Sequence, residues 1–148
     1  MHFRPKFTSE QIAALRLAYE QAVYEVYRSG QTIKLSIGED SPQLNDLMRA
    51  YQVASWAIIT ASNPYSQCLT ESENRQLGQQ LQEYLQKLNF SVLQAAGKDR
   101  RGEWTPEQSF LILGIEADQA IAIGQKFAQN AIVYGKLNQP AKLIWVQN

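Results

Sequence analysis

The spacing of apolar residues along the chain predicts four helices. Two of them begin with a capping box, in which a Thr is followed three residues later by Gln or Glu, at Thr8 and at Thr70. A third begins with Ser41 as its N-cap and Pro42 in its first turn. Apolar side chains then recur every three or four residues, as in an amphipathic helix. The fourth helix covers residues 117–128, and its small residues would let it lie close to a sheet.

Runs of alternating or continuous apolar residues predict six or seven β-strands. Residues 23–37 are typical of a β-hairpin with a turn at Ser29 and Gly30 and one solvated face, because apolar and polar residues alternate along its second arm. Residues 56–59 are continuously apolar, which indicates a central strand covered on both faces. The other predicted strands cover residues 92–96, 110–115, 131–134 and 143–146.

The order of these elements, αββαβαββαββ, predicts a single α+β domain with a mixed β-sheet packed by about four helices. The chain of 148 residues can bury one sizeable core but is too short for two ordinary domains. Residues 1–7 are expected to form a flexible N-terminal segment. Two connections, from strand 56–59 to strand 92–96 and from strand 110–115 to strand 131–134, pass through helices and could produce parallel pairs.

Charge and cysteine content narrow the range of functions. Lys plus Arg and Asp plus Glu each total 14, so no basic excess favours nucleic acid or anionic lipid. The basic residues near Arg100 stand beside acidic ones and are interpreted as a solvated turn. One Cys, and no charged start followed by a long apolar run, argue against a disulfide scaffold, a secretory signal and a membrane-spanning helix. We expect a soluble cytoplasmic protein that binds neither nucleic acid nor membrane.

The scarcity of His and Cys excludes many catalytic mechanisms. The only histidine is His2, so histidine-based zinc sites and Ser-His-Asp or Cys-His triads lack their central residue. Cys68 could be a nucleophile near the helix that begins at Thr70, but a lone thiol packed as a small hydrophobe is the favoured interpretation. The glycines form no phosphate loop or dinucleotide fingerprint. We expect no metal and no cofactor, which leaves carboxylate chemistry and binding through amide groups.

Two polar clusters lie between the predicted central strand and the long helix. Asn63 follows the strand at the end where α/β sheets commonly place ligands, although an Asn63-Pro64 turn alone would also explain it. Glu73 and Asn74 stand at the start of the long helix, where amide groups and the helix dipole favour an anion. Helix capping is the stronger explanation for this second cluster.

Two further polar clusters precede predicted strands. Residues 104–109 come before strand 110–115, and residues 105–108 also carry the cap and first-turn pattern of a single helical turn. Residues 129–130 join the last helix to strand 131–134, and an Asn there readily adopts the left-handed cap conformation. The candidate site residues from these clusters are Trp104, Glu107, Ser109, Gln129 and Asn130.

Four sequence blocks together resemble a bacterial family catalogued as domain of unknown function 3293. The blocks are WAIITASNP at 56–64, SEN at 72–74, WTPEQSFLILGI at 104–115 and FAQNAIVYG at 127–135, and the resemblance covers about residues 24–135. The family carries no assigned reaction that can be transferred. The resemblance implies only where to look, at the matching polar positions Asn63, Pro64, Glu73, Asn74, Trp104, Glu107, Ser109, Gln129 and Asn130.

Two hypotheses for the function follow. The first is a non-catalytic or regulatory module that binds a small polar ligand or a protein through its amide-rich loops, since Asn and Gln offer donors and acceptors without a titratable proton. The second is an enzyme in which Glu73 or Glu107 is a general base and Asn63, Asn74 or Asn130 orients the substrate. A buried Glu beside a Trp would have the raised pKa that this role needs.

A third possibility is a scaffold protein or homo-oligomer that uses a sheet edge or the Tyr-rich segment 19–27. All site hypotheses depend on one spatial expectation. The side chains of Asn63, Glu73, Glu107 and Asn130 should face a shared concavity, because distant loops gain functional meaning only when they converge.

Overall fold

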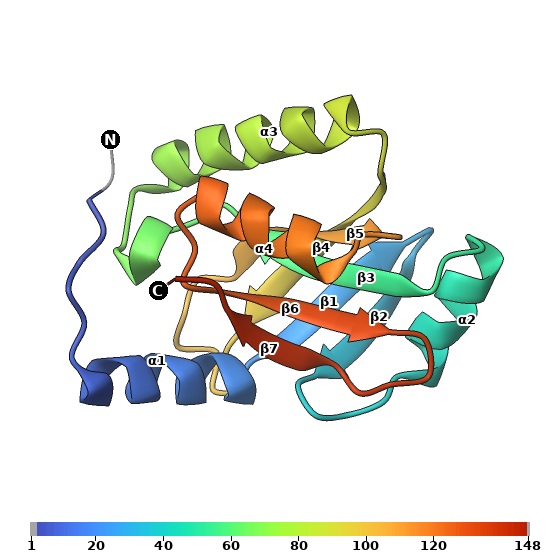
Figure 1. Cartoon of the computed structure of the whole chain (residues 1–148), viewed down its shortest axis with the longest axis horizontal. Coiled ribbons are helices and arrows are strands. Elements are labelled where there is room, and N and C mark those ends of the chain that lie inside the picture. The colour runs from blue at the N-terminus through green and yellow to red at the C-terminus, as the bar shows by residue number, and fades with distance from the viewer. Residues whose placement is uncertain (1–2, 148) are drawn as a thin grey trace.

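The structure is a computed structural model that describes residues 3–147, in which four α-helices pack on one seven-stranded β-sheet. This arrangement confirms the predicted α+β fold (Figure 1). His2 lies outside the described residues. The helices are α1 (Ser9–Gln21), α2 (Pro42–Ala50), α3 (Glu71–Lys87) and α4 (Ala117–Lys126), with a 3₁₀ turn η1 (Pro64–Ser66). The strands are β1 (Val23–Arg28), β2 (Gln31–Ser36), β3 (Ser55–Thr60), β4 (Ser91–Lys98), β5 (Glu107–Leu113), β6 (Ala131–Lys136) and β7 (Lys142–Trp145).

The sheet is antiparallel throughout, so the prediction of parallel pairs in a mixed sheet is wrong. Its strand order is β2-β1-β4-β5-β3-β6-β7, and every hydrogen-bonded pair is antiparallel. The crossovers through α3 and α4 do return the chain in its original direction. However, β5 lies between β3 and β4, and β3 lies between β5 and β6. Each crossover therefore skips one strand, which is the split βαβ arrangement of ferredoxin-like folds.

The central strand β3 contributes to two apolar cores, one on each face of the sheet. Trp56 and Ile58 face the core that α2 covers, whereas Ala57 and Ile59 face the core that α3 and α4 cover. Figure 1 shows α3 and α4 together on one side of the sheet and α2 apart from them. Side chains alternate between the two faces of a strand, so a strand buried on both faces must be continuously apolar. The predicted central strand is confirmed.

Local sequence signals fix the ends of the helices and the first hairpin. Capping boxes are present at Thr8 and Thr70, and the Ser41 side chain accepts a hydrogen bond from the backbone N–H of Leu44. The hairpin turn lies at the predicted position, between β1 and β2. The predicted close approach of α4 is confirmed at Gly124, because a Cβ built there would lie 2.8 Å from the side chain of Ile132.

The single helical turn predicted for residues 105–108 does not form. Glu107 begins β5 and pairs with Gly97 of β4, while the Gln108 side chain hydrogen-bonds across the strands to Gln94 at 3.2 Å. Glu107 and Gln108 pair with Gly97 and Ala96 of β4, and this pairing gives their backbone groups ladder partners that one isolated helical turn could not provide. Tertiary pairing thus overrides the local capping pattern.

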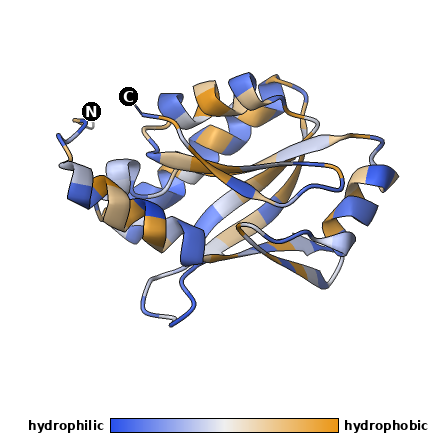
Figure 2. Cartoon of the chain, turned by 60° about the horizontal axis from the view of Figure 1, so that its bottom comes forward, coloured by the Kyte–Doolittle hydropathy of each residue, from blue (hydrophilic) through white to orange (hydrophobic). Residues whose placement is uncertain are grey.

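The first helix lies on the outside of the molecule. None of the residues of α1 is buried, although Figure 2 shows hydrophobic residues on it. Leu17 of this helix is 55% exposed. Its Tyr19 ring contacts Trp145 of β7, with 6.4 Å between ring centroids. Among residues 3–147, no helix has the length and apolar character needed to cross a membrane. The flexibility expected for the N-terminal segment stays a prediction.

Candidate functional site

The strand order brings the loops at one rim of the sheet together. Because β3 lies between β5 and β6 and is antiparallel to both, the end of β3 lies beside the beginnings of its two neighbours. Thr60 at the end of β3 pairs with Ser109, and Gly97 near the end of β4 pairs with Glu107. Three polar segments that are far apart in the sequence, after β3, at the start of β5 and before β6, therefore meet at the same place.

A cavity of about 60 Å³ opens at this rim, and we call it the inner cavity. Its volume exceeds the roughly 10–15 Å³ that one water molecule needs. Five of the residues predicted from sequence line it, namely Asn63, Glu107, Ser109, Gln129 and Asn130. The expected convergence therefore holds for Asn63, Glu107 and Asn130 but not for Glu73, which does not line the cavity.

Asn63 joins three segments through its side chain. The Nδ2 group donates to Oε2 of Glu107 at 2.9 Å. The Oδ1 atom accepts from the backbone N–H of Leu69 at 3.0 Å and from Nδ2 of Asn74 at 2.9 Å. The backbone N–H of Asn63 in turn donates to Oδ1 of Asn74 at 2.8 Å. Because the amide has different partners on its two sides, its orientation is fixed and its donor is directed at Glu107.

Glu107 provides a largely buried carboxyl group in the wall of the cavity. Burial raises the pKa of this carboxyl above its usual value, and the hydrogen bond from Asn63 opposes the rise by stabilising the carboxylate. Only Oε2 has a hydrogen bond to another described residue, so Oε1 can still accept one. A carboxyl group with a raised pKa in a polar cavity is a candidate for binding or proton transfer.

Tyr19, Ser66 and Asn130 meet at the cavity from three different elements. The Tyr19 hydroxyl and Oγ of Ser66 form a short hydrogen bond, and Nδ2 of Asn130 donates to both, at 3.3 Å and 3.2 Å respectively. The hydroxyl of Tyr24 donates to the backbone oxygen of Tyr19 at 3.2 Å. Burial, followed by the nearby Glu107 and Tyr19, raises the pKa of the Tyr24 phenol well above its ordinary value, so this phenol stays neutral.

Several residues around the cavity have left-handed backbone conformations. Asn63 has φ 49°, Tyr65 φ 54°, Ser66 φ 62° and Ala128 φ 57°. Asn tolerates this region, whereas Tyr and Ala rarely adopt it, and such strain is often found at binding and active sites. The predicted left-handed cap after α4 is present, but Ala128 occupies it instead of Asn130. The backbone N–H of Tyr65 donates to the Ala128 oxygen at 2.7 Å and links the two strained segments.

Three of the predicted candidates lie outside the inner cavity. Asn74 supports it indirectly, because its side chain bonds both the backbone N–H and the side-chain oxygen of Asn63. Glu73 closes the capping box with Thr70 at the exposed start of α3, in agreement with the capping interpretation. Trp104 is 42% exposed in the loop before β5, and its backbone N–H donates to Asp99 at 3.1 Å.

The favoured interpretation of Cys68 as a packed thiol is wrong. This residue is exposed in the loop between η1 and α3. Pro64 of the neighbouring turn and Ala61 are buried instead. In the part of the chain that the structure describes, no group of three or more His, Cys, Asp or Glu side chains is placed to hold a metal ion.

Tyr19, Tyr24 and Ser66 are polar residues of the cavity that are not among the predicted site candidates. The two tyrosines count as apolar positions of an amphipathic helix and of a strand, and their hydroxyl groups become significant only when the elements meet. Ser66 follows the Asn63-Pro64 turn. It lies 47 residues from Tyr19 in the sequence, so their contact cannot be recognised from the sequence. The Tyr-rich segment 19–27 indicates only a possible scaffold surface, and no signal in the sequence places these three residues at the cavity.

The fold and the cavity together define a class of α+β protein that has a split βαβ core and a polar cavity at one rim of its sheet. The chain belongs to the family described as "Protein of unknown function (DUF3293)", whose model matches residues 59–132. This match confirms the family resemblance, although it is shorter than the predicted range of 24–135. No curated protein and no solved structure matches the chain.

Proposed function

We propose that the protein is a binding module for a small polar molecule that hydrogen-bonds in the inner cavity. One observation carries the proposal. Polar side chains from α1, from the segment after β3, from β5 and from the α4–β6 connection converge on this cavity and leave several oxygen atoms without partners. Buried polar groups in proteins are as a rule hydrogen-bonded, so oxygen atoms without partners at one cavity favour a ligand that supplies donors.

Several hydrogen-bond acceptors of the inner cavity have no partner among the described residues. The amide group of Gln129 is used internally, since Nε2 donates to the backbone oxygens of Ser62 and Phe127, both at 3.2 Å. The amide nitrogens of Asn63 and Asn130 are engaged as described above. Within residues 3–147, no hydrogen bond is made by Oε1 of Glu107, Oε1 of Gln129 or Oδ1 of Asn130. A ligand that carries hydroxyl or amino groups complements such a surface.

The size of the cavity favours a small molecule over a protein partner. A volume of about 60 Å³ accommodates the polar end of a ligand. Protein interfaces use larger and flatter surfaces, of about 800 Å² on each partner.

The proposal is tested by ligand-dependent thermal stabilisation. A panel of amino acids, hydroxy acids and polyols is titrated against the wild-type protein and the Glu107→Gln variant. We expect a saturable rise in Tm with at least one compound and an affinity about tenfold weaker in the variant, because a charged acceptor is replaced by a neutral one. Glu103→Gln is the matched control, since Glu103 is exposed and does not line the cavity. No saturable rise, or equal affinity in E107Q and wild type, would refute the proposal.

A catalytic role for Glu107 is the second candidate function, and the raised pKa of this carboxyl favours it. Glu107 would take a proton from a ligand hydroxyl or amino group, while Asn63 would hold the carboxyl in place through its Nδ2 group. NMR of the compounds that bind, before and after long incubation with protein, separates the two functions. Chemical change with the wild type but not with E107Q indicates an enzyme, and unchanged spectra indicate a binding module. A cytoplasmic location and a homo-oligomeric state stay predictions.

A further inference from the structure

A second and larger pocket adjoins the inner cavity. This outer pocket has a volume of about 440 Å³ and is formed by the N-terminal segment, α1, the end of β7 and the α4–β6 connection. Its volume lies in the range of about 300–1,000 Å³ that is typical of small-molecule sites. The residues that line it are Arg4, Pro5, Lys6, Phe7, Ile12, Asn130, Trp145 and Gln147.

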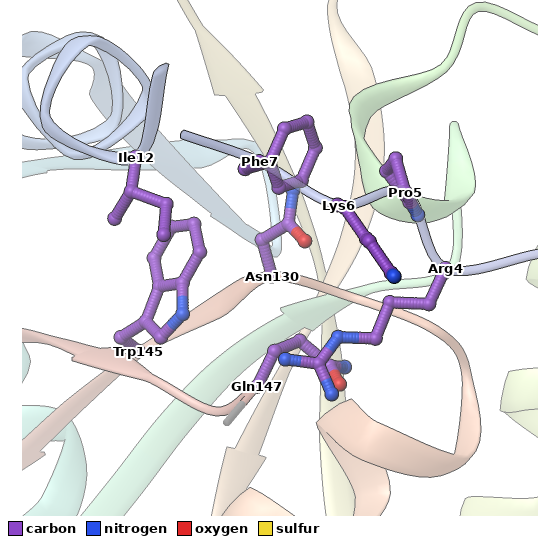
Figure 3. A pocket seen from close by; sticks show the side chains of 8 residues that line it. All are labelled: Arg4, Pro5, Lys6, Phe7, Ile12, Asn130, Trp145 and Gln147. Atoms are coloured by element: carbon purple, nitrogen blue, oxygen red, sulfur yellow. The ribbon is translucent and has the colours of Figure 1, made fainter. Parts of the chain in front are cut away.

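Both charged side chains that line the outer pocket are cationic. Arg4 and Lys6 come from the same extended segment, and Figure 3 shows their side chains reaching into the space between this segment and Trp145. The indole nitrogen of Trp145 faces the same space (Figure 3). Among the described residues that line the pocket there is no Asp or Glu. Two cations without a counter-charge, together with an N–H donor, favour an anionic group in this pocket.

Asn130 connects the outer pocket with the inner cavity, because its side chain lines both. Its Nδ2 group is held on the inner side by Tyr19 and Ser66. The contact between the Tyr19 and Trp145 rings, 6.4 Å between centroids, also places a wall of one pocket beside a wall of the other. A ligand in the outer pocket therefore lies next to the acceptors of the inner cavity.

We propose that the outer pocket binds the anionic group of a small organic acid or phosphate ester whose hydroxyl or amino groups reach the acceptors of the inner cavity. Arg4 and Lys6 pair with the anion, and the oxygen atoms of Asn130 and Glu107 accept hydrogen bonds from the rest of the ligand. This inference rests on the proposed function, because it assigns a chemical class to the ligand of the same site. The volume of about 440 Å³ suits a small molecule with one anionic end.

The test uses L-malate and glycerol 3-phosphate as anionic probes, which separate a carboxylate from a phosphate ester, and glycerol as the neutral probe. Binding is measured by thermal shift and by intrinsic fluorescence, with Trp145→Phe to assign the fluorescence change to the pocket. We expect one anionic probe to bind saturably and glycerol to bind about tenfold more weakly or not at all. The double variant R4Q/K6Q should weaken binding of the anion by about tenfold or more.

The matched control is the double variant R101Q/K136Q. It changes the net charge by the same amount at two exposed residues that line neither pocket, so anion binding should be unchanged. All four substituted side chains are exposed, and none of them takes part in the apolar cores, so both double variants should fold.

Each outcome supports or overturns a defined part of the inference. Weaker binding in both R4Q/K6Q and E107Q supports the shared ligand. Weaker binding in R4Q/K6Q with unchanged binding in E107Q leaves an anion site in the outer pocket and refutes the proposed function of the inner cavity. Equal binding in R4Q/K6Q and wild type, or no saturable response to either anion, overturns the inference. In that case, the proposed function is still supported if a neutral compound raises the Tm of wild type and binds more weakly to the Glu107→Gln variant.

Discussion

Replacing Asn63 with alanine should lower the free energy of unfolding by about 4–5 kcal/mol. The substitution removes the hydrogen bonds that the side chain makes with Leu69 and Asn74, each worth about 1 kcal/mol, and the bond to the Glu107 carboxyl, worth about 2 kcal/mol because a charged group takes part. It also places Ala at φ 49°, which adds about 1 kcal/mol of backbone strain. Since a domain is stable by only about 5–15 kcal/mol, the loss should be easy to measure.

Urea denaturation of wild type, Asn63→Ala and Asn89→Ala tests this reasoning. Asn89 is exposed, has φ 62°, and makes no side-chain hydrogen bond to any other residue in 3–147, so its variant measures the left-handed strain alone. We expect N89A to lose about 1 kcal/mol and N63A about 3–4 kcal/mol more. If the two variants lose the same amount, Asn63 only forms a turn, and the network that orients Glu107 has no energetic importance.

Three further predictions concern other parts of the same structure. The E107Q variant should gain stability relative to wild type as pH rises above about 4.3, the ordinary pKa of Glu. The pKa of Glu107 is raised in the folded state, so wild type loses stability when this carboxyl ionises. A difference in the free energy of urea unfolding that does not change with pH would contradict this. Ala128→Gly should raise Tm by about 2–4 °C, because it removes about 1 kcal/mol of left-handed backbone strain at φ 57°. A lower Tm of the variant in calorimetry would refute this prediction. Gly135→Ala should lower the free energy of unfolding by about 3 kcal/mol, because the added Cβ would lie 2.5 Å from the Trp56 ring. Gly97→Ala is the control: the atom nearest to its added Cβ is 3.5 Å away, so the free energy of unfolding in the same urea assay should hardly change.

Short-range features of the fold could be predicted from the sequence, whereas the strand order could not. The capping boxes and the continuously apolar β3 depend on contacts within one element, so residues such as Thr70 and Trp56 indicate them directly. The insertion of β5 between β3 and β4 depends on pairing between residues far apart, such as Ile59 with Phe110. A helical crossover is equally compatible with an adjacent strand and with a skipped one, which is why parallel pairs were predicted.

The candidate site was predictable only where a polar residue interrupts an apolar element. Asn63 and Glu107 satisfy this condition, and both line the inner cavity. Glu73 satisfies it as well, yet its polarity is explained by the capping box. Arg4 and Lys6 stand in a segment with no periodicity, so their place in the outer pocket follows only from where the N-terminal segment meets the end of β7. Sequence patterns thus identify unusual polarity, and tertiary structure decides which of it forms a site.

The two pockets draw on different parts of the chain. The matched family region, residues 59–132, supplies the acceptors of the inner cavity, including Glu107 and Asn130. The cations and the indole of the outer pocket come from residues 4–6 and from Trp145, outside that region. In the proposed binding mode, the anionic group and the hydrogen-bond donors of the ligand contact different parts of the chain. Substitutions at Arg4 and Lys6 should then change the preference for the charge of the ligand and leave the recognition of its hydroxyl or amino groups unchanged. In this mode, residues 59–132 would determine which hydroxyl or amino groups are hydrogen-bonded. The segments on either side would determine which anionic group is selected.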